Sequence, residues 1–192
     1  MERSDKKEEY AKVLDFMLTG KPFSNKAEPL SQVVGELWFT LLEVIPKDNV
    51  TLTLNERVYI GMAERDKIAM IKARIPYEKL TQTAKNELPI AVEDIIRSNE
   101  QRFVEFFNKA APLNIREHSL ALLPGIGKKY LQLILQARKE KPFESFVDIS
   151  ARIPSLPDPV KVLSERVLQE LQGNERFYLF AKPFNPLQQH QQ

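Results

Sequence analysis

One short stretch limits the fold more than any other: residues 123–127, Leu-Pro-Gly-Ile-Gly, between two apolar runs. Pro124 cannot continue a helix, because its ring clashes with the preceding turn and its nitrogen carries no hydrogen. Gly125 and Gly127 allow positive φ and bring bare backbone to the surface. The stretch is therefore predicted to be a tight turn between two helices, with Ile126 anchored between them.

Such a turn presents backbone amides beside the N-terminus of the next helix, whose positive dipole end favours an anion. Lys128 and Lys129 follow immediately and add mobile positive charge. From Arg116 to Lys141, six Lys or Arg residues and two Glu residues give an excess of +4, whereas the whole chain carries a formal net charge of +2. A surface for a polyanion is therefore expected as a local patch.

The stretch resembles the helix-hairpin-helix motif, whose hairpin amides grip a nucleic-acid phosphate without reading bases. Ile134 and Arg138 stand where the motif has an apolar residue and an arginine in its second helix, and Leu131 replaces a usual small residue. A plain helical hairpin with a Pro-Gly turn is the alternative. The resemblance implies a phosphate-contacting set that positions the protein without specifying sequence: Gly125, Ile126, Gly127, Lys128, Lys129, Arg138 and Lys139.

Residues 153–157, Ile-Pro-Ser-Leu-Pro, look like a degenerate second hairpin, with Ser155 and Pro157 in the places of the two glycines. Pro157 has no N–H to offer a phosphate, so this copy is expected to be structural. With the Lys-Pro-Phe-Glu-Ser-Phe stretch at 141–146, the order resembles tandem helix-hairpin-helix domains. Up to about Phe180 the chain is similar to an uncharacterised archaeal family that joins an OB-like barrel to such a domain. That resemblance implies a nucleic-acid-binding, RNA-linked protein.

The N-terminal part is predicted to be a small curled sheet or barrel, because several short strands follow one another without a long helix. Among such barrels we favour the OB-fold, whose exposed face could hold a single strand by base stacking. The aromatic candidates for stacking are Tyr10, Trp38, Phe39 and Tyr59. For each of them, a place in the core is the stronger expectation. The predicted strands are residues 10–19, 32–46 with a bend at Gly35, 50–54, 58–61 and 68–75. The apolar spacing of 32–46 also fits a helix.

The remaining chain is predicted to be helical, apart from a last strand at 176–181 that returns to the barrel. Pro89 is expected to open an amphipathic helix to Ala110, and Asn114 to cap the next one. Further helices are predicted from Lys128 to about Lys139, from Ser145 to Arg152 and from Asp158 to Gly173. The predicted fold class is α+β: residues 1–80 an OB-like β-barrel, 81–112 linking and packing helices, 113–173 an all-helical tandem helix-hairpin-helix domain, and 174–192 a strand and flexible tail.

Composition excludes several classes of protein. The chain has no cysteine, which rules out disulfides and iron–sulfur clusters and leaves the cytoplasm as the default location. No long apolar stretch follows the charged start, so neither a signal peptide nor a membrane span is expected. His118 and His190 are the only histidines, too few for a metal site. No P-loop and no Ser/His/Asp arrangement is apparent. The oligomeric state is left open.

Two other functions compete with non-enzymatic binding. A base-excision glycosylase would use Lys129 to attack the sugar, with Asp148 nineteen residues later stabilising positive charge. Asp148 is better explained as completing the cap begun by Ser145, and a base-flipping domain is not evident. A protein-interaction scaffold would dock on a ribosomal, polymerase or repair partner. We expect a non-enzymatic binder that favours RNA over DNA, with no metal or cofactor. A monovalent cation at the hairpin carbonyls, which some relatives of the motif hold, is left open.

Overall fold

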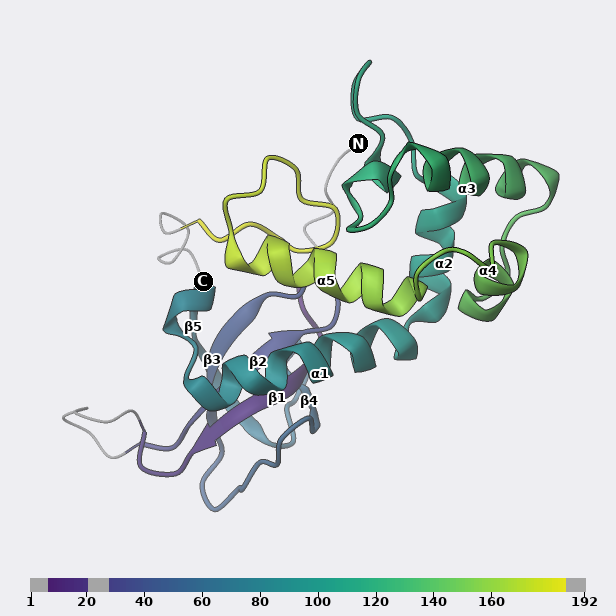
Figure 1. Cartoon of the computed structure of the whole chain (residues 1–192). Coiled ribbons are helices and arrows are strands. Elements are labelled where there is room, and N and C mark those ends of the chain that lie inside the picture. The colour runs from purple at the N-terminus through teal and green to yellow at the C-terminus, as the bar shows by residue number, and fades with distance from the viewer. Residues whose placement is uncertain (1–6, 21–27, 186–192) are drawn as a thin grey trace. The chain divides into compact units, whose positions relative to one another are not determined.

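The structure is a computed structural model that describes residues 7–20 and 28–185. Within these residues the chain is α+β, with one five-stranded antiparallel sheet and five α-helices (Figure 1). It divides into two compact units. The sheet unit comprises the described residues up to Val92 and those from Glu170 onward, and the helical unit comprises Glu93–Gln169. The predicted boundaries at 80, 112 and 173 differ from this division, and the tail from residue 186 lies outside the described residues.

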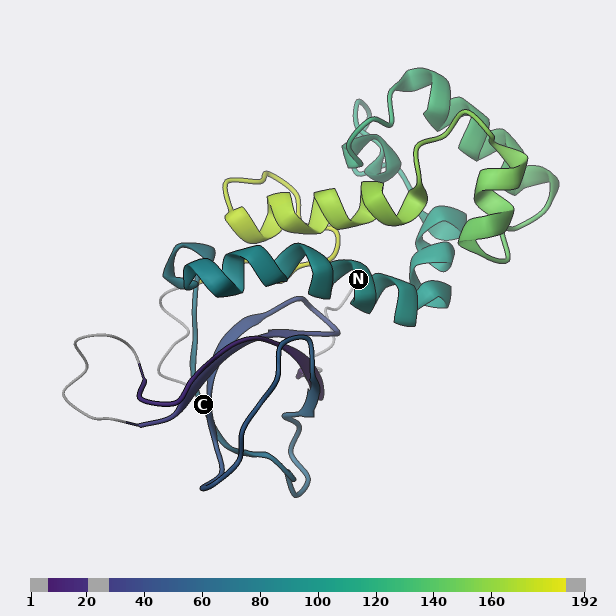
Figure 2. The ribbon, with the colours of Figure 1, turned by 60° about the horizontal axis from the view of Figure 1, so that its bottom comes forward.

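The sheet curls strongly on itself (Figure 2). Its strand order is β4-β1-β2-β3-β5, with β1 (Tyr10–Met17), β2 (Leu30–Gly35), β3 (Leu41–Pro46), β4 (Arg57–Tyr59) and β5 (Ile68–Arg74). The register of β1 against β2 shifts at Leu14, and that of β5 against β3 shifts twice. Such bulges bend a strand and increase its twist, which accounts for the curl. Closure into an OB-type barrel stays a prediction.

The concave core of the sheet unit gathers apolar side chains from every strand: Ala11, Val13, Val33, Leu42, Val44, Leu52, Val58, Ile60 and Ile68. The predicted strands at 10–19, 58–61 and 68–75 are confirmed as β1, β4 and β5. Residues 50–54 form a loop instead of the predicted strand. Their alternation arises because Leu52 lies in this core and Val50 packs against it, without a ladder partner.

The predicted long strand over 32–46 is wrong, since a turn separates β2 from β3. Every residue of β2 is buried, including Ser31 and Gln32. These two polar side chains are satisfied, since Ser31 Oγ donates to the Asp15 carbonyl at 2.7 Å and Gln32 Nε2 donates to Glu43 Oε1 at 3.1 Å. The Glu8 carboxylate holds the turn by accepting from the amides of Leu37, Trp38 and Thr40 at 2.7, 2.9 and 3.1 Å. Within the turn Phe39 has φ +51 and is fully buried, which removes it from the stacking candidates.

The helix predicted from Pro89 to Ala110 is wrong at its start and misses a break at Asn99, although its predicted end agrees with α2 (Glu100–Lys109), for which Ala110 is the C-cap. The first helix, α1 (Gln82–Ser98), starts earlier and contains Pro89 in its interior. Thr81 caps it: its Oγ1 accepts from the Ala84 amide at 3.1 Å and donates to Asp15 Oδ2 at 2.6 Å. Residues 82–92 lie along the sheet in both views (Figures 1 and 2). The buried side chains of Leu88 before Pro89 and of Ala91 and Val92 after it offset the hydrogen bond that proline removes.

The C-terminal segment returns to the sheet unit, but not as the predicted strand at 176–181. The buried Glu170 carboxylate accepts from the amides of Leu179, Phe180 and Ala181 at 2.7–2.9 Å. The Lys182 amide then donates to the Trp38 carbonyl at 3.0 Å. One carboxylate thus satisfies the backbone donors that a strand would have paired with a neighbour.

The helical unit contains the end of α1, α2 (Glu100–Lys109), the 3₁₀ turn η2 (Ser119–Leu122), α3 (Lys128–Glu140), α4 (Phe146–Arg152) and most of α5 (Pro159–Gln172). A further 3₁₀ turn, η1 (Tyr77–Lys79), precedes α1. The predicted caps of α4 and α5 are confirmed: Ser145 Oγ accepts from the Asp148 amide at 3.0 Å, and Asp158 Oδ1 accepts from the Val160 amide at 2.9 Å. Among the described residues, no helix is both long and apolar enough to cross a membrane.

Candidate nucleic-acid interface

The hairpin turn follows η2 and leads directly into α3. The Ile126 amide donates to the Leu123 carbonyl at 3.0 Å, which closes a four-residue turn. Gly125 has φ +76, the value required at the third position of a type II turn, where Pro-Gly at the centre is favoured. The Ile126 side chain is buried, so its predicted role as the anchor of the turn is confirmed.

Gly127 has a different role from the one predicted. Its backbone is extended, with φ −80° and ψ −177°, so positive φ is not the reason for glycine here. A Cβ at this position would have no atom within 4 Å. Gly127 is the N-cap of α3 and has no side chain to accept from the first-turn amides. Because Gly127 has no side chain, the positive N-terminal end of α3 is open to an anion.

The free donors of the hairpin can be identified one by one. In the described part of the chain, the amides of Gly125 and Gly127 have no acceptor, and both residues are exposed. The amides of Lys128 and Lys129 belong to the first turn of α3, where no intrahelical partner exists. The Ile126 amide was predicted from the sequence to be one of the phosphate donors. This amide already closes the turn, so it is not free to bind a phosphate.

The predicted cations fall into two groups. Lys128, Lys129 and Lys139 are exposed, and no ion pair to them occurs within residues 7–20 and 28–185. Arg138 instead donates through Nη1 to the carbonyls of Phe107 and Ala110, at 2.9 and 2.8 Å. Burial lowers the pKa of the Arg138 guanidinium. This side chain caps the C-terminal end of α2, a role that the sequence did not reveal.

The first arm of the hairpin is shorter than predicted. Asn114 does not begin a helix; its Oδ1 accepts from the amides of Arg116 and Glu117 at 2.8 and 3.0 Å and forms an Asx turn. His118 then caps η2, its Nδ1 accepting from the Leu120 amide at 3.1 Å. Burial, and secondarily the charge of Arg138, lowers the pKa of His118. In the described residues no group of three His, Cys, Asp or Glu side chains could hold a metal ion.

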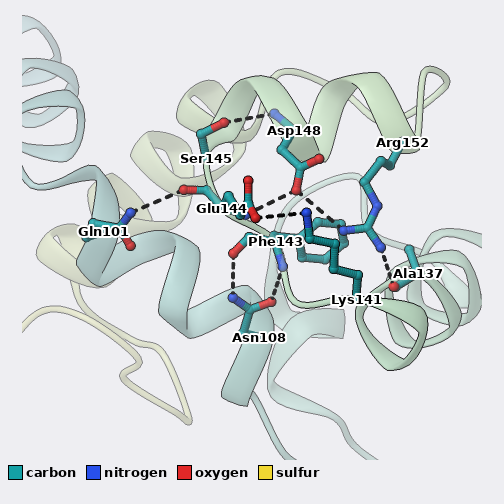
Figure 3. A network of polar contacts seen from close by, with 9 residues as sticks. All are labelled: Gln101, Asn108, Ala137, Lys141, Phe143, Glu144, Ser145, Asp148 and Arg152. Carbon is teal, nitrogen blue, oxygen red and sulfur yellow. Dashed lines mark hydrogen bonds and ion pairs between the residues drawn. The ribbon is translucent and has the colours of Figure 1, made fainter.

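A polar network fixes the connection from α3 to α4 (Figure 3). The Asn108 side chain holds both backbone groups of Phe143: its Oδ1 accepts from the amide at 2.8 Å and its Nδ2 donates to the carbonyl at 2.9 Å. Arg152 donates to the Ala137 carbonyl and pairs with Asp148 Oδ2 at 3.4 Å. The same Asp148 oxygen accepts from the Glu144 amide at 3.1 Å. Asp148 is therefore engaged in holding the start of α4.

The second hairpin lies beside the first. Its Leu156 amide donates to the Ile153 carbonyl at 2.9 Å, matching the closing bond of the first turn. The Tyr130 hydroxyl donates to the Ser155 carbonyl at 2.6 Å, and a Cβ on Gly125 would lie 3.7 Å from Pro157 Cγ. Ser155 is not among the residues with positive φ, so this turn lacks the type II form of the first.

The family described as "Protein of unknown function (DUF655)" matches residues 7–182. The chain belongs to this family. "Uncharacterized protein MJ0038" of Methanocaldococcus jannaschii is 44% identical over 182 residues, which cover 94% of this chain and 82% of that protein. The crystal structure of Af1531 from Archaeoglobus fulgidus, described with the same family, is 44% identical with a TM-score of 0.85. The match covers 91% of this chain and 100% of Af1531. The predicted membership of an uncharacterised archaeal family is confirmed.

Proposed function

We propose that this DUF655 chain is a non-enzymatic nucleic-acid-binding protein that grips a backbone phosphate through the first hairpin. One observation carries the proposal: the exposed amides of Gly125 and Gly127 lack acceptors in the described chain and adjoin the uncapped N-terminus of α3. The resemblance of residues 123–138 to the helix-hairpin-helix motif identifies the anion as a nucleic-acid phosphate. RNA is favoured over DNA, with a role in translation or RNA metabolism, because the resemblance of the whole chain to an archaeal family implies an RNA-linked protein. A cytoplasmic location is the default for a chain without cysteine.

The charges around the hairpin support a polyanion rather than an isolated small anion. Lys128 and Lys129 have no carboxylate partner within the described residues. Lys139, at the other end of α3, has none there either. Contacts made by amides and lysines alone bind without sequence preference, typically with a dissociation constant on the order of 1–100 µM at physiological salt. Affinity is therefore expected to fall steeply with salt and to vary little with base sequence.

The geometry also supports binding over base-excision chemistry. Asp148 is paired with Arg152 and bonded to the Glu144 amide, so its carboxylate already has structural partners. Lys129 is exposed, with its Nζ 6.0 Å from the centre of the Tyr130 ring. Incubation with duplexes containing damaged bases, followed by borohydride, should trap no covalent adduct. An adduct that disappears in Lys129→Ala would overturn the non-enzymatic assignment.

The direct test is the salt dependence of binding. Replacing Lys128 and Lys129 together by alanine should reduce the slope of log K against log salt by up to about 1.4 for a single strand or about 1.8 for a duplex. Lys109 and Lys161 provide the matched control, because each is ion-paired, with Glu105 and Glu93 respectively. Their double alanine variant removes the same charge and should keep the slope of the wild type. Equal slopes in all three proteins would refute the proposal.

A second candidate function, docking on a protein partner, rests on the loop before η2. Ile115 is 104% exposed, yet the loop is held by the Asx turn of Asn114 and by a 2.8 Å bond from the Leu113 amide to the Glu117 carbonyl. Leu113, two residues earlier on the same loop, is also exposed at 40%, and neighbouring exposed apolar side chains, unlike single ones, indicate a contact site. Ile115→Ser should then release a ribosomal, polymerase or repair partner, while Val147→Ser, at a 77% exposed position on α4, should not.

A further inference from the structure

The exposed face of α3 carries one kind of chemistry along its length. Lys128, Gln132, Gln136 and Lys139 are all exposed and lie within about 80° of one another at about 3.6 residues per turn. Ile134 points the other way and is fully buried. From Lys128 to Lys139 the face extends about 16 Å along the helix axis. It therefore continues the hairpin surface along a line.

Within the described residues, this face has none of the ion pairs that other helices of the helical unit form. There, a cation and an acid four residues apart neutralise each other: Arg97 with Glu93, Lys109 with Glu105 and Arg152 with Asp148. On α3 the positions four and eight residues after Lys128 are glutamines, and Glu140 at the end is the sole acid of the helix. No ion pair to Lys128 or Lys139 occurs in the described part of the chain, and Glu140 is the one carboxylate next to Lys139. The positive charge of the face complements a line of negative charge.

We propose that this face of α3 is a track for several consecutive phosphates of one nucleic-acid strand. The hairpin and Lys128 hold the first phosphate, the amide groups of Gln132 and Gln136 donate to the next ones, and Lys139 pairs with the last. One strand of a duplex carries a charge about every 3.4 Å of axis, so about 16 Å reaches beyond a single phosphate. This inference rests on the proposed function and names its ligand as an extended strand instead of one isolated phosphate.

The ordinary explanation is a solvated helix face, with Lys139 favoured by the negative end of the helix dipole. That explanation gives the two glutamines no role, so charges placed there should change binding no more than charges placed elsewhere. The track gives them a definite role: carboxylates at 132 and 136 would face phosphates, and ammonium groups would pair with them. The two explanations therefore separate at the glutamines.

The experiment compares full-length variants on single strands of 3 and 12 nucleotides. Gln132→Glu with Gln136→Glu should weaken binding of the 12-mer at least about tenfold by like-charge repulsion, and that of the 3-mer much less. Val147→Glu with Ser150→Glu is the control, since it adds the same charge at exposed positions of α4. Gln132→Lys with Gln136→Lys is the second variant and should raise the salt slope for the 12-mer by up to about 1.4.

The outcomes distinguish this inference from the proposed function. Equal binding by the α3 and α4 glutamate variants, together with an unchanged slope in the lysine variant, overturns the track. If the Lys128 and Lys129 alanine variant still loses affinity in that case, the hairpin grip survives as a single-phosphate contact. If that variant also binds like wild type, both proposals fail. A 12-mer penalty confined to the α3 glutamates supports the track.

Discussion

Gly127→Asp should stabilise the protein and weaken its binding to nucleic acid at the same time. Gly127 already has the extended backbone of an N-cap residue, with φ −80° and ψ −177°, and a side chain there would meet nothing within 4 Å. An aspartate at an N-cap accepts from the amides two and three residues on, which here belong to Lys129 and Tyr130. The new carboxylate would thus occupy the position that we assign to a phosphate.

The two effects can be sized separately. Aspartate exceeds glycine at an N-cap by a few tenths of a kcal/mol, and the helix dipole adds about 0.3–1 kcal/mol, so the free energy of unfolding should rise by about 0.5–1.4 kcal/mol. In a chain of this size that raises the melting temperature by about 2 °C. Binding should weaken by at least about 2 kcal/mol, since each hydrogen bond to a charged group contributes about 1.5–3 kcal/mol. That loss corresponds to about thirtyfold in affinity.

Thermal unfolding and fluorescence anisotropy with labelled RNA and DNA measure both quantities on the same samples. Gly127→Asn is the first control: it caps without a charge, so it isolates occupation of the amides from repulsion. Ser150→Asp is the second, because it adds the charge at an exposed position of α4. A stabilised Gly127→Asp protein that binds as tightly as wild type would show that phosphate does not use this helix end. A destabilised one would refute the capping geometry.

Three further outcomes are expected. Gly35→Ala should destabilise the sheet unit by at least about 3 kcal/mol in urea, because its Cβ would lie 2.1 Å from Glu8 Cδ and displace the carboxylate from three amides. Because the pKa of His118 is lowered in the folded protein, its contribution to the free energy of unfolding is fully present above pH 6.5 and is lost as pH falls toward the folded-state pKa. His118→Asn keeps an N-cap acceptor and should flatten the pH dependence of the free energy of unfolding. Ser155→Asp should leave nucleic-acid affinity near that of wild type, and a loss as large as that of Gly127→Asp would contradict the structural role of the second hairpin.

Features encoded within a few residues could be predicted from the sequence. Ser145 and Asp158 cap α4 and α5 as expected, and Gly173 ends α5 with φ +86, because a cap depends on its own turn. The turn between β2 and β3 could not be predicted, because it depends on Glu8, about thirty residues earlier. The start of α1 likewise depends on Thr81 being anchored to Asp15 across the sheet unit.

The candidate site shows the same limit. The local pattern located the turn and the two lysines correctly on one exposed surface. The commitment of the Ile126 amide could also have been derived, since a type II turn closes between its first and fourth residues. The role of Arg138 could not, because its acceptors are carbonyls at the end of α2, 28 and 31 residues away. A basic residue near a predicted site thus becomes a ligand candidate only when no backbone acceptor already holds it.

The two adjacent hairpins differ in the feature on which the proposed anion site depends. Both close with the same bond, from the fourth residue to the first, at 3.0 and 2.9 Å, and both bury the apolar residue that makes it. A connector needs nothing more. An anion site needs amides left over, and these depend on the flanking residues: glycine at 125 and 127 leaves both amides exposed, whereas Pro157 has no amide hydrogen and Ser155 adds a side chain. The binding that we propose for the first hairpin therefore depends on the backbone donors that its turn does not use.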